Sequence, residues 1–452
     1  MTAVRLLLAT IAGTAIANNY AIQPALATVA TDLGVGLPVA GLVPTAALTG
    51  CMAGFVLLLP LTDRLAPNRL VAAQLTVLAT ALTVAAASAH PAVLLAAYVV
   101  IGAAAGVAAQ AGVIAGRHAP PGRRAAAVAT VAAGMSAGIL LSRLAGGALT
   151  DLLGWRWMLL VFATLALAGA VAARLLLPGA RPAVVRLPFS SARPAVVRLP
   201  FSSARPAVAR LPAIGPAASA RQRPAADRTP AGAAGPSGQR PHTSESYTAA
   251  LAALPRQLRR HPALRWAVAA GGLWYLAFHL VWVALALALA PFGPAVIGLY
   301  SLAGLLGFAA LPYAGRLTDR FGAATVIAAS LLTAAAGTAL LATGLDHPPV
   351  TAFGLALLDA GCFTAQAANQ SRVQALDPRR SGSLSSVYLV LYFAVGAVGA
   401  ALAGPILDTA GWHGAAAVAL AALLAALAVD QTAVRRERPH RLERDNATPL
   451  QT

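Results

Sequence analysis

Three ionisable side chains lie inside long apolar stretches of the sequence, where an unpaired charge is costly. They are Arg143, His279 and Asp359. An arginine in the middle of a membrane helix costs about 2.5 to 3.5 kcal/mol, so residues of this kind are typically retained for function. A carboxyl group can carry a proton between two aqueous sides, and an imidazole can relay protons near neutral pH. An arginine can bind an anionic group.

Each of the three also has a structural interpretation, which the sequence leaves open. Protonated Asp359 and neutral His279 can each hydrogen-bond to a neighbouring helix. Arg143 lies about seven residues, roughly 10 Å, before the end of its stretch, so it can extend toward Asp151 or the lipid headgroups. We predict that Asp359 and His279 are proton-coupling residues and that Arg143 faces a substrate cavity.

Polar and aromatic residues share helical faces with these charges. Phe363, Gln366 and Gln370 follow Asp359 at four, seven and eleven residues, so all four lie on one face of a helix. The other predicted cavity residues are also amides or aromatics inside apolar stretches: Asn19, Gln23, Tyr275, Trp282, Tyr388 and Tyr392. For Asn19 and Gln23, hydrogen bonding between helices is an equal interpretation, and for Gln370 so is a solvated amide.

The stretches that must position these residues are long enough to cross a membrane. The sequence is 58% hydrophobic and 10% charged, whereas soluble domains contain roughly 25% charged residues. About 20 apolar residues span a bilayer as a helix. We predict an all-α membrane protein with twelve such helices, at residues 5–29, 38–60, 70–89, 91–115, 125–149, 155–177, 263–290, 294–313, 323–343, 350–371, 383–405 and 413–430. The first stretch is too long for a signal peptide and has no convincing cleavage site.

The charge of the chain is strongly basic and unevenly placed. The formal net charge is +19, and every basic residue is an arginine. These arginines gather in alternate loops, in the segment between the two halves and in the C-terminal tail, whereas nucleic-acid binding would need a basic face. The positive-inside rule therefore predicts a multi-pass protein of the cytoplasmic (inner) membrane with both termini in the cytoplasm. Cys51 and Cys362 lie in different halves, which argues against a disulfide framework.

The chain contains an internal repeat. Leu61-Thr62-Asp63-Arg64 recurs as Leu317-Thr318-Asp319-Arg320, at an offset of 319 − 63 = 256 residues. Asp151 and Trp155 recur as Asp408 and Trp412, 257 residues later. Several landmarks in one order at one spacing indicate a duplication, so we predict two pseudo-symmetric six-helix bundles.

The repeat divides the chain into four parts. We predict an N-terminal bundle at 1–178, a low-complexity cytoplasmic linker at 179–262, a C-terminal bundle at 263–430 and a disordered tail at 431–452. The linker repeats the sequence of residues 181–192 at 193–204 and is rich in proline and arginine. At its end, leucines at helical spacing beside arginines predict an amphipathic helix at 246–260 on the membrane surface.

The repeated tetrapeptide resembles the loop motif of the major facilitator superfamily, approximately G-x-L-a-D-R-x-G-R. The second copy, Gly315-Arg316-Leu317-Thr318-Asp319-Arg320-Phe321-Gly322, fits well, whereas the first has Leu59 and Ala66 where glycines are usual. The resemblance implies a cytoplasmic gate formed by Asp63, Arg64, Gly315, Asp319, Arg320 and Gly322.

Two further segments resemble the drug- and sugar-efflux-like branch of that superfamily. Residues 138–147 follow the helix-five signature G-x-x-x-G-P-x-x-G-G, with Ser142-Arg143 in place of Gly-Pro. Tyr98 stands where many drug antiporters carry an arginine. The resemblance implies a secondary transporter with alternating access, and it favours proton-coupled efflux of a small organic solute.

Two other functions remain as alternatives. One is proton- or ion-coupled uptake of an organic acid or other metabolite, with Arg143 binding the carboxylate. The other is a membrane sensor that transports nothing. An enzyme is disfavoured, because the lysine of a phosphate-binding loop and any cluster of metal ligands are missing from the sequence. We therefore expect no cofactor and no metal, and as partners a small-molecule substrate, protons and the lipid bilayer, with no nucleic acid. We expect a monomer.

Overall fold

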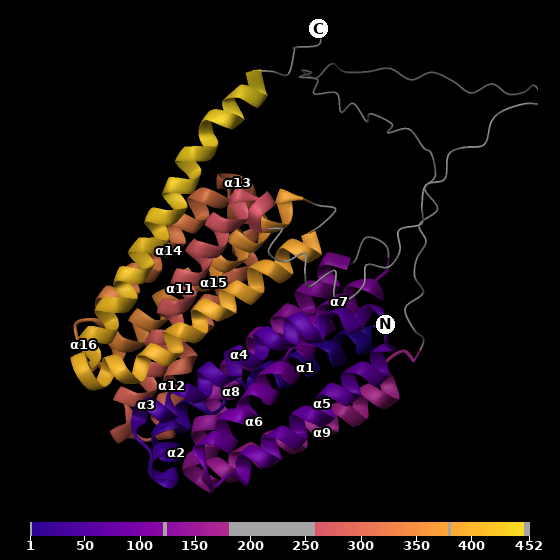
Figure 1. Cartoon of the computed structure of the whole chain (residues 1–452), viewed down its shortest axis with the longest axis vertical. Coiled ribbons are helices and arrows are strands. Elements are labelled where there is room, and N and C mark those ends of the chain that lie inside the picture. The colour runs from indigo at the N-terminus through magenta and orange to yellow at the C-terminus, as the bar shows by residue number, and fades with distance from the viewer. Residues whose placement is uncertain (1, 121–123, 180–257, 378–380, 447–452) are drawn as a thin grey trace, which may run out of the picture. The chain divides into compact units, whose positions relative to one another are not determined.

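Figure 1 shows the computed structural model of the chain, which describes residues 2–120, 124–179, 258–377 and 381–446. The regular elements in these ranges are all helical. They belong to one compact unit, which comprises residues 1–182 and 246–452. We call residues 2–179 the N-terminal half and residues 258–446 the C-terminal half.

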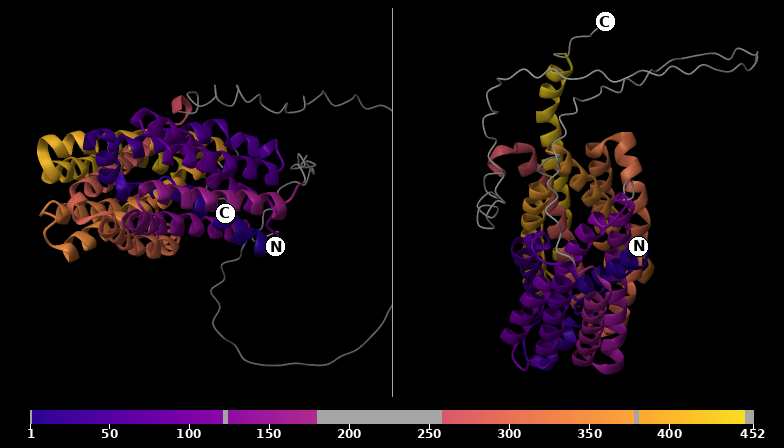
Figure 2. Two further views of the ribbon diagram at one scale, coloured as in Figure 1. Left: turned by 90° about the horizontal axis from the view of Figure 1, so that it is seen from below. Right: turned by 90° about the vertical axis from the view of Figure 1, so that its right-hand side faces the viewer.

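The helices follow the apolar stretches of the sequence closely. The N-terminal half contains α1 (Thr2–Ala17), η1 (Gln23–Ala25), α2 (Leu26–Leu33), α3 (Leu37–Ala40), α4 (Leu42–Leu57), η2 (Leu59–Asp63), α5 (Pro67–Ala86), α6 (Pro91–Ala105), α7 (Val107–Arg117), α8 (Arg124–Leu153) and α9 (Trp155–Leu176). The C-terminal half contains α11 (Pro262–Ala288), η3 (Ala290–Phe292), α12 (Pro294–Tyr300), η4 (Ser301–Ala303), α13 (Gly304–Phe321), α14 (Ala323–Leu341), α15 (Pro348–Leu376) and α16 (Ser381–Asn446). In each half the helices pack side by side, as α5 with α9 and α11 with α16 (Figure 2).

Within the described ranges, nine helices are long and apolar enough to cross a membrane, against the twelve stretches that we predicted. Three local features account for the difference. The first stretch is broken into α1, η1 and α2 around its run of polar residues, and the eighth is broken into α12, η4 and α13. The last two stretches form α16, which has non-helical backbone at Gly411 (φ +63°). All twelve predicted stretches are thus helical, with these breaks and with shorter ones between α3 and α4 and between α6 and α7.

The first part of the predicted C-terminal tail is helical in the structure. Helix α16 continues to Asn446, although we expected residues 431–452 to be a disordered tail. Residues 431–438 are mostly strong helix formers, such as Ala, Gln, Arg and Glu, so the helix propagates past the apolar stretch. Most of the predicted linker, including residues 246–257 of the predicted surface helix, lies outside the described residues.

Corresponding corners of the two halves confirm the repeat in three dimensions. Gly154 (φ +87°) and Gly411 (φ +63°) each adopt a left-handed backbone, which favours glycine, and each precedes a tryptophan. The indole N–H of Trp155 donates to Asp32 Oδ2 at 3.2 Å, and that of Trp412 donates to the carbonyl of Leu341 at 2.7 Å. In both halves the tryptophan therefore ties a helix corner to a neighbouring element.

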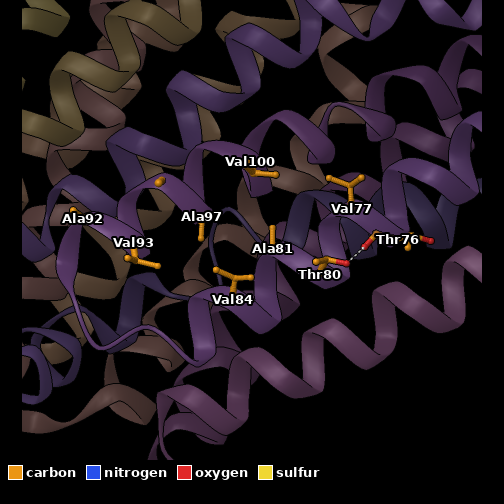
Figure 3. A pocket seen from close by; sticks show the side chains of 10 residues that line it. Thr76, Val77, Thr80, Ala81, Val84, Ala92, Val93, Ala97 and Val100 are labelled. Atoms are coloured by element: carbon orange, nitrogen blue, oxygen red, sulfur yellow. Dashed lines mark hydrogen bonds between the residues drawn. The ribbon is translucent and has the colours of Figure 1, made fainter.

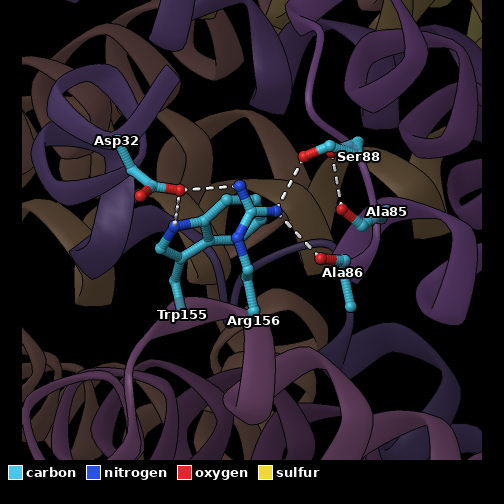
Figure 4. A network of polar contacts seen from close by, with 6 residues as sticks. All are labelled: Asp32, Ala85, Ala86, Ser88, Trp155 and Arg156. Atoms are coloured by element: carbon cyan, nitrogen blue, oxygen red, sulfur yellow. Dashed lines mark hydrogen bonds and ion pairs between the residues drawn. The ribbon is translucent and has the colours of Figure 1, made fainter. Parts of the chain in front are cut away.

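A polar network holds the N-terminal corner (Figure 4). Arg156 Nη2 pairs with Asp32 Oδ2 at 2.7 Å, and its Nη1 donates to the carbonyls of Ala86 (2.9 Å) and Ser88 (2.7 Å). The guanidinium also lies 4.3 Å from the ring centroid of Trp155. Because these residues come from α2, α9 and the end of α5, the network joins three elements of one half. We interpret it as structural.

Helices α4 and α6 approach each other closely at glycines. A Cβ atom added at Gly102 would overlap the carbonyl of Ala47, and one at Gly50 would overlap the carbonyl of Val99. Small residues that let two backbones approach in this way are typical of helix pairs in membranes.

We therefore expect Gly102→Ala to destabilise the protein by roughly 1–3 kcal/mol, because the added methyl group forces the two helices apart. Thermal unfolding of the purified protein in detergent measures this effect. Gly112→Ala is the matched control, because a Cβ atom at Gly112 meets no atom within 4 Å. Equal melting temperatures for the two variants would contradict the prediction.

Candidate functional site

The two halves touch at the end where α2 stops and α3, α9 and α12 begin (Figure 1). We call this the far end. Asp151 Oδ2 of α8 accepts a hydrogen bond from the backbone N–H of Ala295 in α12 at 3.0 Å. Ser301 Oγ donates to the carbonyl of Leu140 at 3.3 Å. These two hydrogen bonds therefore join the N-terminal half to the C-terminal half, and each of them involves a backbone group.

Arg143 lies at the interface between the halves. It is 3% exposed, and its Nε donates to the side-chain oxygen of Gln23 at 2.8 Å. Its guanidinium carbon lies 4.0 Å from the ring centroid of Trp282 and 4.9 Å from that of Tyr20. The side chain thus points into the protein and contacts both halves, whereas Asp151 is bound to Ala295.

Asp359 contacts the same tryptophan through its indole N–H. It is 2% exposed, and its Oδ1 accepts the indole N–H of Trp282 at 2.9 Å. Trp282 therefore contacts the cation through its ring face and the carboxyl group through its N–H. A group of four residues results: Gln23 and Arg143 from the N-terminal half, Trp282 and Asp359 from the C-terminal half. We call this group the central cluster.

Aromatic rings surround the central cluster. His279 is 1% exposed and packs edge-on against Tyr275, with ring centroids 4.4 Å apart. Tyr275 stacks on Tyr392 at 3.9 Å. Tyr20 stacks with His279 at 6.3 Å, which adds an aromatic residue that the sequence analysis had not included among the candidates. Phe363 also lies in this group, 5.6 Å from the ring of Phe278.

Several buried polar atoms near the central cluster have no hydrogen-bond partner in the described structure. They are Arg143 Nη2, Gln23 Nε2, Asn19 Oδ1 and both ring nitrogens of His279. Asn19 also donates to Cys51 Sγ at 3.1 Å. Buried polar groups are normally paired, so such a group of unpaired atoms indicates a place for water or a ligand.

The remaining cavity candidates belong to a second polar chain inside the C-terminal half. The hydroxyl of Tyr388 donates to Gln366, and Gln366 Nε2 donates to Gln370 at 3.4 Å. Asn369 Nδ2 donates to the hydroxyl of Tyr388 at 3.2 Å, and Arg372 Nη2 donates to Asn369 Oδ1 at 2.7 Å.

This chain ends in a buried ion pair that the sequence analysis did not predict. Arg372 Nη1 pairs with Asp430 Oδ1 at 2.7 Å, and Asp430 is 0% exposed. We had placed Asp430 at the last residue of an apolar stretch and Arg372 just outside one. The pair could have been predicted if the continuation of α16 past residue 430 had been anticipated, because the longer helix makes Asp430 an interior residue.

The repeated gate motif adopts different structures in its two copies. Asp63 ends the 3₁₀ helix η2 and Arg64 follows it, and the carbonyl of Thr62 accepts from Arg117 Nη1 at 3.1 Å. Gly315, Asp319 and Arg320 lie in α13 itself, which Gly322 (φ +81°) ends. The second copy is therefore the last turns of a helix, whereas the family motif predicted a loop.

An apolar pocket on the N-terminal half differs in character from the central cluster (Figure 3). It has a volume of about 620 Å³ and lies between α5 and α6, lined by valines, alanines and threonines. The hydroxyls of Thr76 and Thr80 both donate to carbonyls of their own helix. With its polar groups satisfied and Val77 and Val100 exposed, this pocket suits lipid chains better than a polar solute.

The described residues contain no group of three or more His, Cys, Asp or Glu that could hold a metal ion. The candidate chemistry is that of a buried carboxyl group, a buried guanidinium and aromatic rings, positioned where two similar helical halves meet. This arrangement defines the class of protein as a membrane transporter built from two repeats.

Comparisons with known proteins identify the family. The chain matches the Major Facilitator Superfamily over residues 8–290 and 267–451, so it belongs to that family. It is 31% identical over 425 residues to a probable transporter of Streptomyces coelicolor, SCO4007, covering 93% of this chain and 84% of that protein. It is 33% identical over 144 residues to the putative uncharacterised transporter YgaY of Escherichia coli, covering 32% of this chain and 36% of that protein.

Solved structures show the same fold. The nucleoside transporter NupG matches with a TM-score of 0.64 at 12% identity, over 95% of this chain and 99% of that one. The human organic anion transporter MFSD10 matches with a TM-score of 0.57 at 17% identity, over 94% and 97%. A bacterial homologue of the human lysosomal transporter Spinster gives 0.61 at 15%, over 96% and 95%. These structures show the fold, and membership of the Major Facilitator Superfamily shows that the protein is a membrane transporter and not an enzyme.

Proposed function

We propose that the protein exports a small organic solute across the cytoplasmic membrane in exchange for protons. In this proposal it works as a monomer with both termini in the cytoplasm, and the two halves expose the central cluster to each side in turn. The observation that carries the proposal is the position of Asp359, a carboxyl group buried where the halves meet. Ionisable residues within membranes commonly mark the pathway of a proton or a solute.

The hydrogen bonds of Asp359 suit exchange of a proton. Oδ1 accepts the indole N–H of Trp282, and this hydrogen bond does not occupy Oδ2. A proton can therefore bind at Oδ2 without displacing a side chain, and a solute that needs the ionised carboxylate competes with that proton. Among the ionisable groups, Arg143 acts electrostatically on Asp359, and Asp359 in turn acts on Tyr20 and Cys362. His279, whose ring nitrogens have no partner, is the second candidate for carrying a proton.

The sidedness of the proposal comes from the arginine pattern and the contacts. From the positive-inside rule applied to the arginine-rich loops, we infer that the far end faces the outside of the cell. The halves touch at the far end through Asp151 and Ala295, as expected for a transporter that is closed to the outside. In this arrangement Asp63, Arg64, Gly315, Asp319, Arg320 and Gly322 form the gate at the cytoplasmic end.

Proton flux in proteoliposomes tests this proposal. Purified protein is reconstituted with a pH-sensitive dye in the lumen, and candidate solutes are added under an imposed pH gradient. Exchange predicts that the solute and protons move in opposite directions. The absence of proton movement with every solute of a broad panel would contradict the proposal and favour a membrane sensor.

One observation favours a second candidate, proton-coupled uptake of an organic acid. Arg143 Nη2 and Gln23 Nε2 are buried donors without a partner, which suits a carboxylate. An anion bound near Asp359 favours the protonated carboxyl group, because two negative charges repel each other. Uptake therefore predicts that solute and protons move in the same direction in the same assay.

A further inference from the structure

Beside the hydrogen bond between Arg143 and Gln23, each of the two side chains has a buried donor without a partner. Arginine only donates hydrogen bonds, so the oxygen of the Gln23 amide must face Arg143 and the Nε2 group must face elsewhere. Arg143 Nη2 is bonded to the same carbon as Nε, and Gln23 Nε2 to the same carbon as the accepting oxygen. The two unpaired donors therefore flank one hydrogen bond of 2.8 Å. Two neighbouring N–H groups, one of them charged, are the donor set that a carboxylate prefers.

The other side of the central cluster offers an acceptor. Asp359 Oδ1 accepts the indole N–H of Trp282, and Oδ2 takes no part in that hydrogen bond. An ammonium group is a natural partner for such an oxygen. Trp282 contacts both charged groups, Arg143 through its ring face and Asp359 through its N–H.

We propose that the solute is a small zwitterion with an apolar body, whose anionic group binds Arg143 and Gln23 and whose cationic group binds Asp359 Oδ2. This inference rests on the proposed transport function and names its substrate class. One positive and one negative buried side chain contact a single indole, so a solute with one charge of each sign can pair with both. The Arg143 guanidinium lies 4.9 Å from the ring centroid of Tyr20 and 5.9 Å from that of Phe278, so these rings can contact the apolar body.

Binding of a zwitterion is consistent both with the unpaired donors of Arg143 and Gln23 and with export. A purely anionic solute leaves Asp359 facing a second negative charge, which favours movement of the anion together with a proton. The cationic group of a zwitterion instead competes with the proton for Asp359 Oδ2, as exchange requires. The same residues thus bind the carboxylate and still release a proton when the solute binds.

Matched probes that differ only in charge test this inference. Binding to the purified full chain in detergent is measured by thermal stabilisation with leucine and phenylalanine. Their N-acetyl derivatives keep only the carboxylate, and their amides keep only the ammonium group. We expect at least one zwitterion to bind roughly tenfold or more tightly than both of its derivatives, because each derivative leaves one buried charge unpaired.

Two variants test which protein side chain binds which charged group of the solute. Arg143→Gln should remove the preference for phenylalanine over its amide and keep the preference over the N-acetyl derivative. Asp359→Asn should do the reverse. Tyr98→Phe is the matched control, because the Tyr98 hydroxyl is another buried group without a partner, but it belongs to α6 and lies outside the central cluster. It should leave both preferences unchanged.

Three results would overturn the inference: no binding of either zwitterion at millimolar concentration, binding independent of probe charge, or preferences that neither variant changes. Preferential binding of the N-acetyl derivatives would identify an anion site instead. The proton-flux assay separates this failure from failure of the proposed function. Proton exchange driven by a solute of another charge class would keep the transport proposal and refute only the zwitterion.

Discussion

Replacing Asp359 by Asn should abolish proton-driven solute movement, while solute exchange at equal pH continues when the solute concentration is high enough to saturate the weakened site. The amide oxygen of Asn can still accept the N–H of Trp282, so the contact at 2.9 Å and the fold are expected to survive. The variant cannot release a proton, and therefore flux driven by a pH gradient should fall to the level of protein-free liposomes. Radiolabelled solute counterflow at equal pH, measured beside the driven flux, separates the two properties.

The control for this prediction is Asp359→Glu, which restores a titratable group with a longer side chain. We expect driven flux to return in part. If Asp359→Asn retained full driven flux, Asp359 would not be the proton carrier, and His279→Gln would be the next variant to measure. Loss of both driven flux and counterflow would indicate a role in solute binding alone.

Replacing Asp430 by Ala should produce the largest loss of stability among single substitutions of charged residues. Asp430 is fully buried and pairs with Arg372 at 2.7 Å, so its removal leaves a guanidinium largely buried without its counter-ion. Breaking such a pair costs about 3–5 kcal/mol. Thermal unfolding in detergent should show a large fall in melting temperature.

An exposed ion pair of equal length is the matched control for Asp430. Asp32 and Arg156 are also 2.7 Å apart, but their side chains are 46% and 38% exposed. Exposed pairs contribute about 0–1 kcal/mol, so Asp32→Ala should cost far less than Asp430→Ala. The double variant Asp430→Leu with Arg372→Met should recover much of the lost stability, because it leaves no unpaired charge. Similar losses for Asp430→Ala and Asp32→Ala would contradict this interpretation.

The helices could be predicted well from the sequence, because a helix that crosses the bilayer must be long and apolar. Apolar stretches of about 20 residues mark membrane helices, and the two halves repeat the corner Gly154-Trp155 as Gly411-Trp412. The breaks in the first and eighth stretches are harder to predict, since hydropathy averages over the local backbone. The extension of α16 depends on helix propensity beyond the membrane, which the apolar pattern ignores.

The candidate site could be predicted in its residues but not in its pairings. Arg143, Trp282 and Asp359 stand out because charged and aromatic groups are unusual in their stretches. Helical spacing relates residues on one helix only, and it says nothing about contacts between α8, α11 and α15. The stacking of Arg143 on Trp282 and the bond from Trp282 to Asp359 are contacts of that kind. The pair of Arg372 and Asp430 was missed for the same reason.

The number of protons released when the solute binds tests the central claim most directly. Calorimetric titration of the purified protein with a transported solute, in buffers of different ionisation enthalpy, measures that number for wild type and for Asp359→Asn. Exchange at Asp359 predicts release of about one proton per solute in the wild type over the pH range where binding depends on pH, and none in the variant. Proton uptake on binding, or equal release by both proteins, would contradict the account.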